Sequence, residues 1–378
     1  MTPAAAAQSI RAALLDAARG LVEREVLVDV IALAAVAEEH VLVVGPPGTA
    51  KSEAVRRVAR AVGGRYFEYL LGRFTEPSEI FGPIDLGKLR AGVVETQTAG
   101  MLPDAEIAFL DEVFLASTAI LNTLLGILNE RTFRRGHTQL TCPLRVCVGA
   151  SNRLPEDESL SAFADRFLVR VFVEPIADPL LEDLLDGGWS LAGPSKLARA
   201  GEASLLGAFD ALGGAARGMD LGEVRPEIAR SLRLLRKNGV NLSDRRAVKL
   251  QSLVAAAAAM GGRERATRAD LWPIVFAVPT REEQALTREV LRDLLAESEN
   301  TALAAAALEA SAGPVARAQR ILRAGSELLD AKPSSGDSLS SWKLRLEGIG
   351  REIDAGFVPE ELPDDLRALR TRIVSELA

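Results

Sequence analysis

Five short apolar runs alternate with stretches of helical periodicity in the first half of the chain. The runs are His40–Val44, Arg65–Leu71, Ile107–Leu110, Leu144–Ala150 and Phe167–Val173. Helices are predicted from Glu53 to about Val62 and over Ser117–Asn129, where apolar residues recur with helical spacing. Strands that alternate with helices form a parallel sheet with helices on both faces. The pattern therefore predicts an α/β fold with a parallel five-stranded sheet over residues 20–178.

The strand pattern stops near Pro175, and helical periodicity continues beyond it. Further helices are predicted near Pro226–Lys237, at Arg245–Met260, from about Arg268, and over Glu282–Leu308, Val315–Leu329 and Asp364–Leu377. The amino-terminal segment Thr2–Leu15 is read as an amphipathic helix. Lys332–Ser338 is short, polar and rich in turn-forming residues, which is typical of a linker. A chain of 378 residues is long enough for two or three domains.

Composition and charge narrow the classes of function. The net charge is −7 and the isoelectric point is near 5.3, whereas dedicated nucleic-acid binders usually carry a strong basic excess. The two cysteines and two histidines are too few for a disulfide framework and make a structural zinc site improbable. No apolar run approaches the ~20 residues of a membrane span, and the amino terminus lacks a signal-peptide pattern. A cytoplasmic protein is expected.

A glycine-rich turn follows the first predicted strand and opens the first helix. It consists of Gly45, Pro46, Pro47, Gly48, Thr49, Ala50, Lys51 and Ser52. This context is that of a phosphate-binding loop, whose backbone N–H groups and helix N-terminus face the phosphates. Lys51 would reach the β- and γ-phosphates, and the Ser52 hydroxyl would coordinate Mg²⁺. The segment therefore predicts a site for ATP and Mg²⁺.

Ala50 departs from the general pattern, which has glycine directly before the lysine. An alanine methyl group is tolerable at this position if the residue has ordinary helical dihedral angles. The rest of the motif is intact, so the segment is still assigned as a phosphate-binding loop.

A second motif places two carboxylates at a strand end. Ile107–Leu110 is apolar and is followed by Asp111 and Glu112, at the edge of the sheet where the phosphate loop also lies. Asp111 would hold Mg²⁺ through its water shell. Glu112 would act as the general base that orients or deprotonates the attacking water. Two acids after a strand alone could be a solvated turn, but together with the upstream loop they indicate ATP hydrolysis.

Asn152 ends the run that contains the fourth predicted strand. Its neutral amide can hydrogen-bond the lytic water or the γ-phosphate without adding charge. The alternative is an asparagine that caps the next turn.

With the phosphate loop, the acidic strand end and Asn152 in this order, the chain resembles AAA+ ATPases. More narrowly, it resembles the MoxR family and its RavA-like branch. The segments that carry the resemblance are Gly45–Ser52, Phe74–Pro83, Gly100–Asp104, Phe109–Phe114, Ala119–Arg131, Gly149–Asn152, Ala164–Phe167 and Ser243–Arg246. The match covers about residues 10–290 and does not extend to the part of the chain past residue 300.

The resemblance implies an AAA+ nucleotide-binding core over residues 1–178, a helical lid over 179–295 and a helical C-terminal extension over 296–378. It also implies a homo-oligomer, usually a hexameric ring with ATP at the subunit interfaces, that hydrolyses ATP to ADP and phosphate. Family members usually operate with a von Willebrand factor A-domain partner. They serve in chaperone-like remodelling or maturation of protein clients.

The same resemblance assigns individual residues. Leu21 and Val22 match the stretch that lines the adenine pocket. Arg166 matches the arginine finger that completes the site of a neighbouring subunit. Arg245, in the lid, matches the sensor that reads the γ-phosphate, with Arg246 as the second candidate.

Several of these assignments have plainer alternatives. The pair Asp165-Arg166 could be a local surface ion pair of little energetic value, and Asp244-Arg245-Arg246 could simply open a helix. Arg131 is a further candidate for action in trans, at the start of Arg131–Gln139, a segment read as an exposed hairpin turn. In the family, such a hairpin and an insertion, here about Thr75–Leu102, point toward the ring pore.

Three other functions remain open on the sequence. A nucleic-acid translocase shares the AAA+ core and predicts salt-dependent DNA or RNA binding, which the acidic isoelectric point disfavours. A metal-chelatase motor subunit would act with a partner that carries the metal. A nucleotide-gated scaffold would use hydrolysis only as a slow timer.

Overall fold

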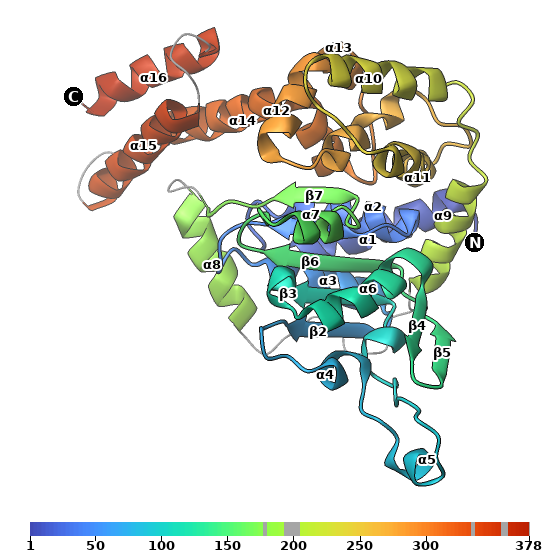
Figure 1. Cartoon of the computed structure of the whole chain (residues 1–378). Coiled ribbons are helices and arrows are strands. Elements are labelled where there is room, and N and C mark those ends of the chain that lie inside the picture. Colours follow the sequence, from blue (N-terminus) through green and yellow to red (C-terminus); the bar gives the residue numbers. More distant parts are fainter. Residues whose placement is uncertain (177–179, 193–204, 334–336, 357–361, 378) are drawn as a thin grey trace. The chain divides into compact units, whose positions relative to one another are not determined.

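The computed structural model describes residues 1–176, 180–192, 205–333, 337–356 and 362–377 (Figure 1). These residues form two compact units. The first contains Met1–Arg19, Arg24–Glu174 and the described residues of 205–311. The second contains Gly20–Glu23, the described residues of 175–192 and those from 312 onward. The division into domains at residues 178 and 295 stays a prediction.

Five parallel strands form the centre of the first unit, in the order β2-β3-β6-β1-β7. Their bounds are β1 Val41–Val44, β2 Tyr66–Leu70, β3 Ile107–Asp111, β6 Val146–Ser151 and β7 Val169–Phe172. Every residue of β1 is buried, because a parallel strand covered on both faces is apolar throughout. Val44 lies opposite Ser151 of β6 and Phe172 of β7, so the carboxyl ends of these strands are level. The predicted parallel five-stranded sheet is confirmed.

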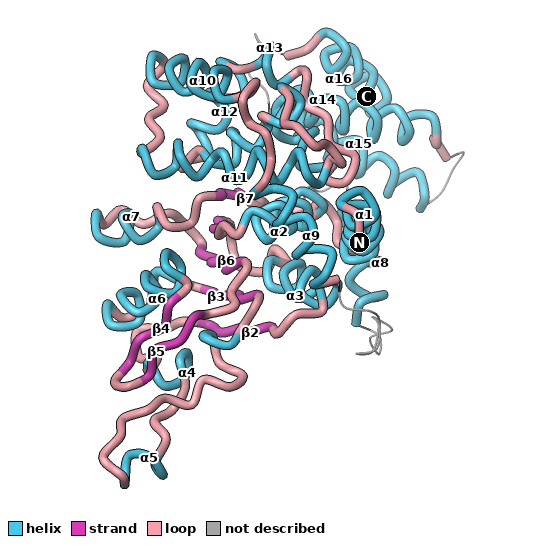
Figure 2. The backbone as a smooth tube through the Cα atoms, turned by 90° about the vertical axis from the view of Figure 1, so that its right-hand side faces the viewer, coloured by secondary structure: helices cyan, strands magenta, loops and turns pink. Residues whose placement is uncertain are grey.

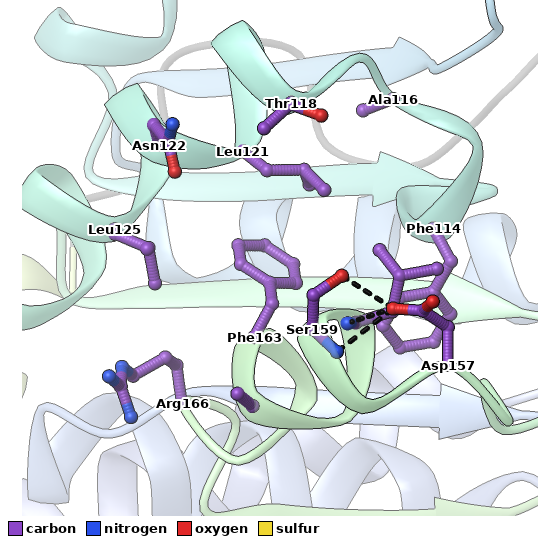
Figure 3. Close-up of a pocket in the computed structure, with 12 residues that line it drawn as sticks. Phe114, Ala116, Thr118, Leu121, Asn122, Leu125, Asp157, Ser159, Phe163 and Arg166 are labelled. Carbon is purple, nitrogen blue, oxygen red and sulfur yellow. Dashed lines mark hydrogen bonds between the residues drawn. The ribbon is translucent and has the colours of Figure 1, made fainter.

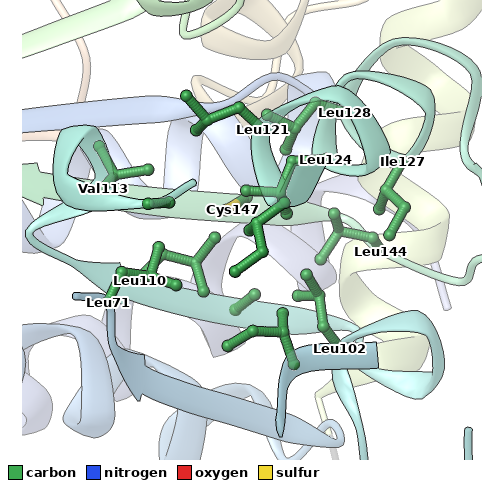
Figure 4. Close-up of a cluster of buried hydrophobic side chains, with 14 of the residues drawn as sticks. Leu71, Leu102, Leu110, Val113, Leu121, Leu124, Ile127, Leu128, Leu144 and Cys147 are labelled. Carbon is green, nitrogen blue, oxygen red and sulfur yellow. The ribbon is translucent and has the colours of Figure 1, made fainter. Parts of the chain in front are cut away.

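Helices cover both faces of this sheet. One face carries α2, Glu25–Ala37, which packs against β1, β6 and β7, and α3, Lys51–Val62, which packs against β3. The other face carries α6, Thr118–Glu130, whose Leu124 and Leu128 join Leu110 and Cys147 in one buried apolar cluster (Figure 4). The periodicity did not single out α2, because it is apolar on nearly all sides and gives little amphipathic signal.

An insertion and a hairpin lie together beside the sheet. The insertion after β2 contains α4, Pro77–Phe81, and α5, Leu86–Arg90, and α5 lies at its far tip (Figure 2). The hairpin pairs β4, Thr132–Arg135, with β5, Thr138–Thr141. The N–H of His137 in the hairpin donates to the Val94 carbonyl of the insertion at 2.8 Å. The predicted hairpin is confirmed.

The rest of the first unit is helical. Its elements are α1 Pro3–Ala18, α7 Glu158–Ala164, α9 Leu206–Arg217, α10 Arg225–Lys237, α11 Asp244–Met260, α12 Arg281–Val290 and α13 Arg292–Leu295. We call the region from α10 to α13, residues 225–295, the lid. The helices predicted near Pro226–Lys237 and Arg245–Met260 are confirmed as α10 and α11. The helix predicted from Arg268 is instead two short 3-10 segments, Arg268–Asp270 and Trp272–Ala277.

The helix predicted over Glu282–Leu308 is interrupted between α13 and α14, Ala304–Asp330. The side chain of Asn300 explains the break. Its Oδ1 accepts from the N–H groups of Ala302 and Leu303 at 3.0 and 2.9 Å, and its Nδ2 donates to the Ala257 carbonyl at 2.8 Å. An asparagine that bonds the backbone in this way competes with helix and favours a turn.

The second unit is built from α8, Leu181–Ala192, the later part of α14, α15, Asp337–Gly356, and α16, Asp364–Leu377. Its buried core includes Leu346, Leu366 and Ile373. The helix predicted at Asp364–Leu377 is confirmed, and residues 334–336 of the predicted linker lie outside the described part. Within the described residues, every helix is too short or too polar to cross a lipid bilayer.

Candidate nucleotide-binding site

The turn between β1 and α3 has the backbone of a phosphate-binding loop. The N–H of Gly45 donates to the Ser151 carbonyl at 3.0 Å, which joins the start of the turn to β6. A Cβ atom at Gly45 would lie 2.2 Å from the Val173 carbonyl oxygen, so only glycine fits. Gly48 has a φ of 79°, in the left-handed region that favours glycine. The two glycines therefore serve close packing and chain reversal.

Arg24 hydrogen-bonds the backbone of the phosphate-binding loop. No pattern in the sequence indicates this contact. Its guanidinium is buried, and its Nε donates to the Thr49 carbonyl at 2.8 Å. Its Nη2 donates to the Glu174 carbonyl, also at 2.8 Å. The Thr49 hydroxyl closes the turn by donating to the Pro46 carbonyl at 2.9 Å. Arg24 lies directly before α2, and no local motif marks it as part of the loop.

Lys51 projects into the loop from the first turn of α3. Its Nζ donates to the carbonyls of Gly45 and Pro46 at 2.7 and 2.8 Å, and 7% of the residue is exposed. Burial lowers the pKa of this ammonium, and the nearby carboxylates of Asp111 and Glu112 oppose the shift. A cation held beside a glycine-containing turn at a helix N-terminus suits the negative charge of phosphate groups. The residues present therefore fit a nucleotide.

Ala50 has left-handed dihedral angles, with φ 58° and ψ 24°. We expected the alanine methyl group to be tolerable if Ala50 had ordinary helical dihedral angles. Ala50 does not have them, so this condition is wrong. Ala50 is the N-cap of α3, and its positive φ sets the direction in which the chain enters the helix at Lys51. A non-glycine residue in this region costs about 1–2 kcal/mol. The loop keeps its shape and carries local strain at Ala50.

Glycine at this position is therefore expected to be tolerated. In Ala50→Gly, relief of about 1–2 kcal/mol of strain is offset by about 0.4–1 kcal/mol of extra unfolded-state entropy. The free energy of unfolding should stay within about 1 kcal/mol of the wild-type value or rise. Urea denaturation measures it. Ala61→Gly, inside α3, is the matched control and should cost about 0.5–1 kcal/mol. Equal losses in both variants would contradict the left-handed assignment.

The acidic pair lies at the carboxyl end of β3, level with the loop. Asp111 ends the strand, and its Oδ1 accepts from the N–H of Glu112 at 3.0 Å. Glu112 has a φ of 50°, which turns its side chain out of the strand direction. Asn152, directly after β6, donates from Nδ2 to Glu112 Oε1 at 2.5 Å. The structure thus brings Glu112 and Asn152 into direct contact.

Ser52 and Asp111 are the predicted magnesium ligands. They come from α3 and β3, which pack against each other. Among the described residues, no three acidic, histidine or cysteine side chains form a group that could hold a metal ion alone. A nucleotide-borne Mg²⁺ takes several oxygens from phosphates and water, so one or two protein oxygens suffice. The pair fits that chemistry.

Arg166 lies at the opposite edge of the sheet. It belongs to Ala164–Leu168, which we call the Arg166 loop and which leads into the amino end of β7. The N–H of Val169 donates to the carbonyl of His40, the residue before β1, at 3.1 Å. Because β1 and β7 are parallel, this contact fixes the Arg166 loop at the amino-terminal edge. The phosphate loop lies at the carboxyl-terminal edge.

A cavity of about 420 Å³ lies beside Arg166, between α6 and α7. Phe114, Leu121, Leu125 and Phe163 supply much of its apolar wall (Figure 3). Burial and the neighbouring Arg245 lower the pKa of the Arg166 guanidinium, and Asp165 opposes the shift. Ser243 and Arg246, which flank Asp244 and Arg245, hydrogen-bond Asp165 and the Phe167 carbonyl on either side of Arg166, so Arg245 and Arg166 lie on adjoining segments.

Arg245 is exposed in the first turn of α11 and donates from Nη1 to Asn129 Oδ1 at 3.3 Å. Asn129 lies at the end of α6, where the Leu128 carbonyl is 2.9 Å from His40 Nε2. Arg245 is thus also at the amino-terminal edge. The four residues of β1 rise about 13 Å between the two edges. Within one chain, the structure does not bring Arg166 and Arg245 to Lys51 and Glu112.

The remaining predicted residues lie elsewhere. Arg131 donates from Nη1 to the Leu128 carbonyl at 2.6 Å and from Nη2 to the Glu38 carbonyl, and it contacts His40. These contacts within the chain leave little of its guanidinium for a neighbour. Leu21 is buried and Val22 partly buried in the second unit, and their adenine-pocket role stays a prediction.

Comparisons with known proteins identify the family. The model of the MoxR domain in the MoxR-vWA-beta-propeller ternary systems matches residues 8–205, and that of an AAA lid domain matches residues 219–290. An uncharacterized protein of Methanocaldococcus jannaschii is 36% identical over 256 residues, which are 66% of this chain and 65% of that protein. The chaperone MoxR1 of Mycobacterium tuberculosis is 28% identical over 174 residues, 45% of each chain. The chain thus spans less than two thirds of either relative.

A solved structure supports the fold. The crystal structure of a proposed ATPase from Cytophaga hutchinsonii has a TM-score of 0.60 and 14% identity, and the match covers 79% of this chain and 97% of that one. At this identity the likeness shows the AAA+ fold alone. The MoxR-domain match, at residues 8–205, covers more than half of the 378 residues. The chain therefore belongs to the MoxR family of AAA+ ATPases.

Proposed function

We propose that this chain hydrolyses ATP at Gly45–Ser52 and that each active site is completed by a neighbouring copy of the chain. One observation carries the proposal. Lys51 and Glu112 lie at the carboxyl-terminal edge of the sheet, whereas Arg166 and Arg245 lie at the amino-terminal edge. A head-to-tail arrangement of identical subunits would bring opposite edges together. A closed hexameric ring is the form of this arrangement that we propose.

The residues at the carboxyl-terminal edge divide the work between binding and chemistry. Lys51 and the N–H groups of the loop would hold the phosphates, and Ser52 and Asp111 would hold Mg²⁺. The bound Mg²⁺ neutralises charge on the phosphate oxygens. Glu112 would take the proton of the attacking water. Asn152 donates to Glu112 at 2.5 Å, which supports a role in keeping that carboxylate aimed at the water.

The two arginines at the other edge would act on the neighbour's nucleotide. Arg166 would stabilise the charge on the transferring phosphoryl group, as an arginine supplied in trans does in other phosphoryl-transfer enzymes. Arg245 lies at the same edge of the sheet as Arg166, on a segment bonded to the Arg166 loop, so any γ-phosphate that Arg245 reads would belong to the same neighbour. Arg245 is thus proposed as a sensor of the neighbour's nucleotide.

We propose that the activity drives chaperone-like remodelling or maturation of protein complexes, in the RavA-like branch of the family. A partner with a von Willebrand A domain is proposed because the matched family description names MoxR-vWA-beta-propeller systems. The Mycobacterium tuberculosis relative is described as a chaperone, which favours protein clients. We propose the cytoplasm as the location. ATP turnover that a purified von Willebrand A-domain partner leaves unchanged would argue against this partner.

Lys51→Ala tests the nucleotide site. The change removes the ammonium that is bonded to the Gly45 and Pro46 carbonyls, so ATP affinity should fall about 10- to 100-fold, as expected for a lost charge-assisted hydrogen bond. Isothermal titration calorimetry with Mg·ATP measures this loss. Lys88→Ala, on the exposed insertion, is the matched control and should bind like wild type. An unchanged affinity in Lys51→Ala would reject the site.

A further inference from the structure

Arg246, the residue after the exposed Arg245, is almost fully buried, with 1% of its surface exposed. Its guanidinium donates four hydrogen bonds. Nε donates to Asp165 Oδ1 at 2.7 Å, and Nη2 donates to the Phe167 carbonyl at 2.9 Å. Nη1 donates to the carbonyls of Leu168 and Ala277 at 2.6 and 2.8 Å. All five N–H directions of an arginine lie in one plane, so these bonds hold their acceptors in a fixed arrangement.

Three of the four acceptors flank Arg166. Asp165 precedes it, and Phe167 and Leu168 follow it. The hydroxyl of Ser243, the N-cap of α11, lies 3.4 Å from the second oxygen of Asp165. Residues at the start of α11 therefore hydrogen-bond the Arg166 loop on both sides of Arg166. The Arg166 side chain itself lies at the cavity between α6 and α7 (Figure 3).

Asp165 pairs with the lid rather than with its neighbour Arg166. Its Oδ1 is 2.7 Å from Arg246 Nε. Among the described residues, Asp165 therefore forms its ion pair with Arg246. The alternative of a surface ion pair between Asp165 and Arg166 is not observed there. A second buried arginine, Arg170 of β7, donates to the Ala164 carbonyl at 2.5 Å at the start of the same loop. The Arg166 loop is thus held by buried cations at both of its ends.

We propose that Arg246 is a positioning residue that fixes the Arg166 loop to the lid, so that the lid and the trans-acting arginine move as one body. The inference rests on the proposed role of Arg166 in a neighbour's site. Two consecutive residues would then have different roles. Arg245 faces outward and would touch the neighbour's nucleotide, whereas Arg246 acts only through the loop that carries Arg166.

A defect in Arg246 should therefore behave as a defect in Arg166. Arg246→Ala is expected to lower ATP turnover about 10- to 100-fold, because a displacement near 1 Å of a catalytic group can cost about 100-fold. The affinity for ATP should be unchanged, because Lys51 and the rest of the phosphate-binding loop are intact. Arg246→Lys should retain more activity, because a lysine can keep one or two of the four bonds. Arg263→Ala is the matched control, since its buried partner Asp270 lies within the lid and does not touch the Arg166 loop.

Mixed subunits distinguish positioning from general destabilisation. An Arg246→Ala chain keeps its own phosphate-binding loop and Glu112, and it lacks only a well-placed Arg166. Co-assembled with Glu112→Gln, which supplies an intact Arg166 loop, it should regain activity. Co-assembled with Arg166→Ala, it should show no recovery above its own low rate, because every interface then lacks a well-placed Arg166. This pair of results supports the inference.

Other results overturn it. Recovery with Arg166→Ala but not with Glu112→Gln would assign Arg246 to its own subunit's site. Recovery with neither partner, in chains that fold and co-assemble by size-exclusion chromatography, would reduce Arg246 to a structural residue. Wild-type turnover of Arg246→Ala alone would also reject it. If Arg246→Ala does not fold, the same mixtures are made with Arg246→Lys. Failure of the reference mixture, Arg166→Ala with Glu112→Gln, would instead reject the trans role of Arg166.

Discussion

Arg166→Ala is expected to reduce ATP turnover by about 10³–10⁵-fold, the range measured for a trans-acting arginine in phosphoryl transfer. Arg166 lies at the edge of the sheet opposite the phosphate loop, so its loss leaves Lys51 and Glu112 of the same chain untouched. Binding of ATP should therefore stay close to wild type. Phosphate release measures the turnover, and calorimetry measures the binding. Arg134→Ala, on the exposed hairpin, removes the same charge elsewhere and should hydrolyse ATP normally.

The variant should recover when it is mixed with the right partner. After disassembly and reassembly with Glu112→Gln, some interfaces combine an intact loop and Glu112 from one chain with an intact Arg166 from the other. Those interfaces are complete, so a measurable fraction of wild-type activity should return. If Arg166 acted within its own chain, no pairing would build a complete site. Mixtures that co-assemble and stay inactive would thus contradict the assignment.

Glu112→Gln is expected to separate binding from hydrolysis. Glutamine keeps an Oε1 that can accept the hydrogen bond from Asn152, now 2.5 Å long, but it cannot take a proton from water. Turnover should fall by about 10²–10⁴-fold, the usual contribution of a general base. ATP should remain bound and uncleaved, and assemblies that depend on ATP should become longer-lived. Retention of radiolabelled ATP, measured with phosphate release, tests both expectations.

The control for this variant lies next to the other end of the same strand. Glu106→Gln removes one carboxylate directly before β3, at the far edge of the sheet, and should hydrolyse ATP like wild type. Its side chain accepts from the Arg65 N–H at 2.9 Å, a bond that glutamine can keep. Hydrolysis by Glu112→Gln at the wild-type rate would show that Glu112 is not the catalytic carboxylate.

The sheet could be predicted from the sequence because each of its strands is short, apolar and bounded by turn residues. Observed strand ends differ from the predicted ones by at most two residues, as at β6, Val146–Ser151, against Leu144–Ala150. The positions of Gly45–Ser52 between β1 and α3, and of Asp111 and Glu112 at the end of β3, could be predicted as well, because phosphate chemistry demands particular residues at fixed spacing. Local sequence is sufficient where chemistry and backbone geometry are both local.

Other features depend on contacts between distant segments. The left-handed angles of Ala50 follow from the join between β1 and α3, which an alanine does not announce. Arg24 reaches a loop some 25 residues away through a carbonyl, and any residue type offers a carbonyl. Whether Arg245 or Arg246 points inward depends on how α11 is rotated against the sheet. That rotation is set by the packing of α11 on α2 and α9, not by the local motif.

The division of the proposed active site between the two edges of the sheet makes catalysis subject to mass action. In a lone chain, the phosphate loop lacks the Arg166 and Arg245 of a neighbour, and the chain's own Arg166 and Arg245 have no nucleotide to act on. Upon dilution, each dissociation event removes complete sites, so the rate per chain should fall with protein concentration even though every chain stays folded. If the concentration of the protein in the cell were low, the same dissociation would keep its ATPase activity low. Synthesis alone could then switch it on, through a threshold in copy number.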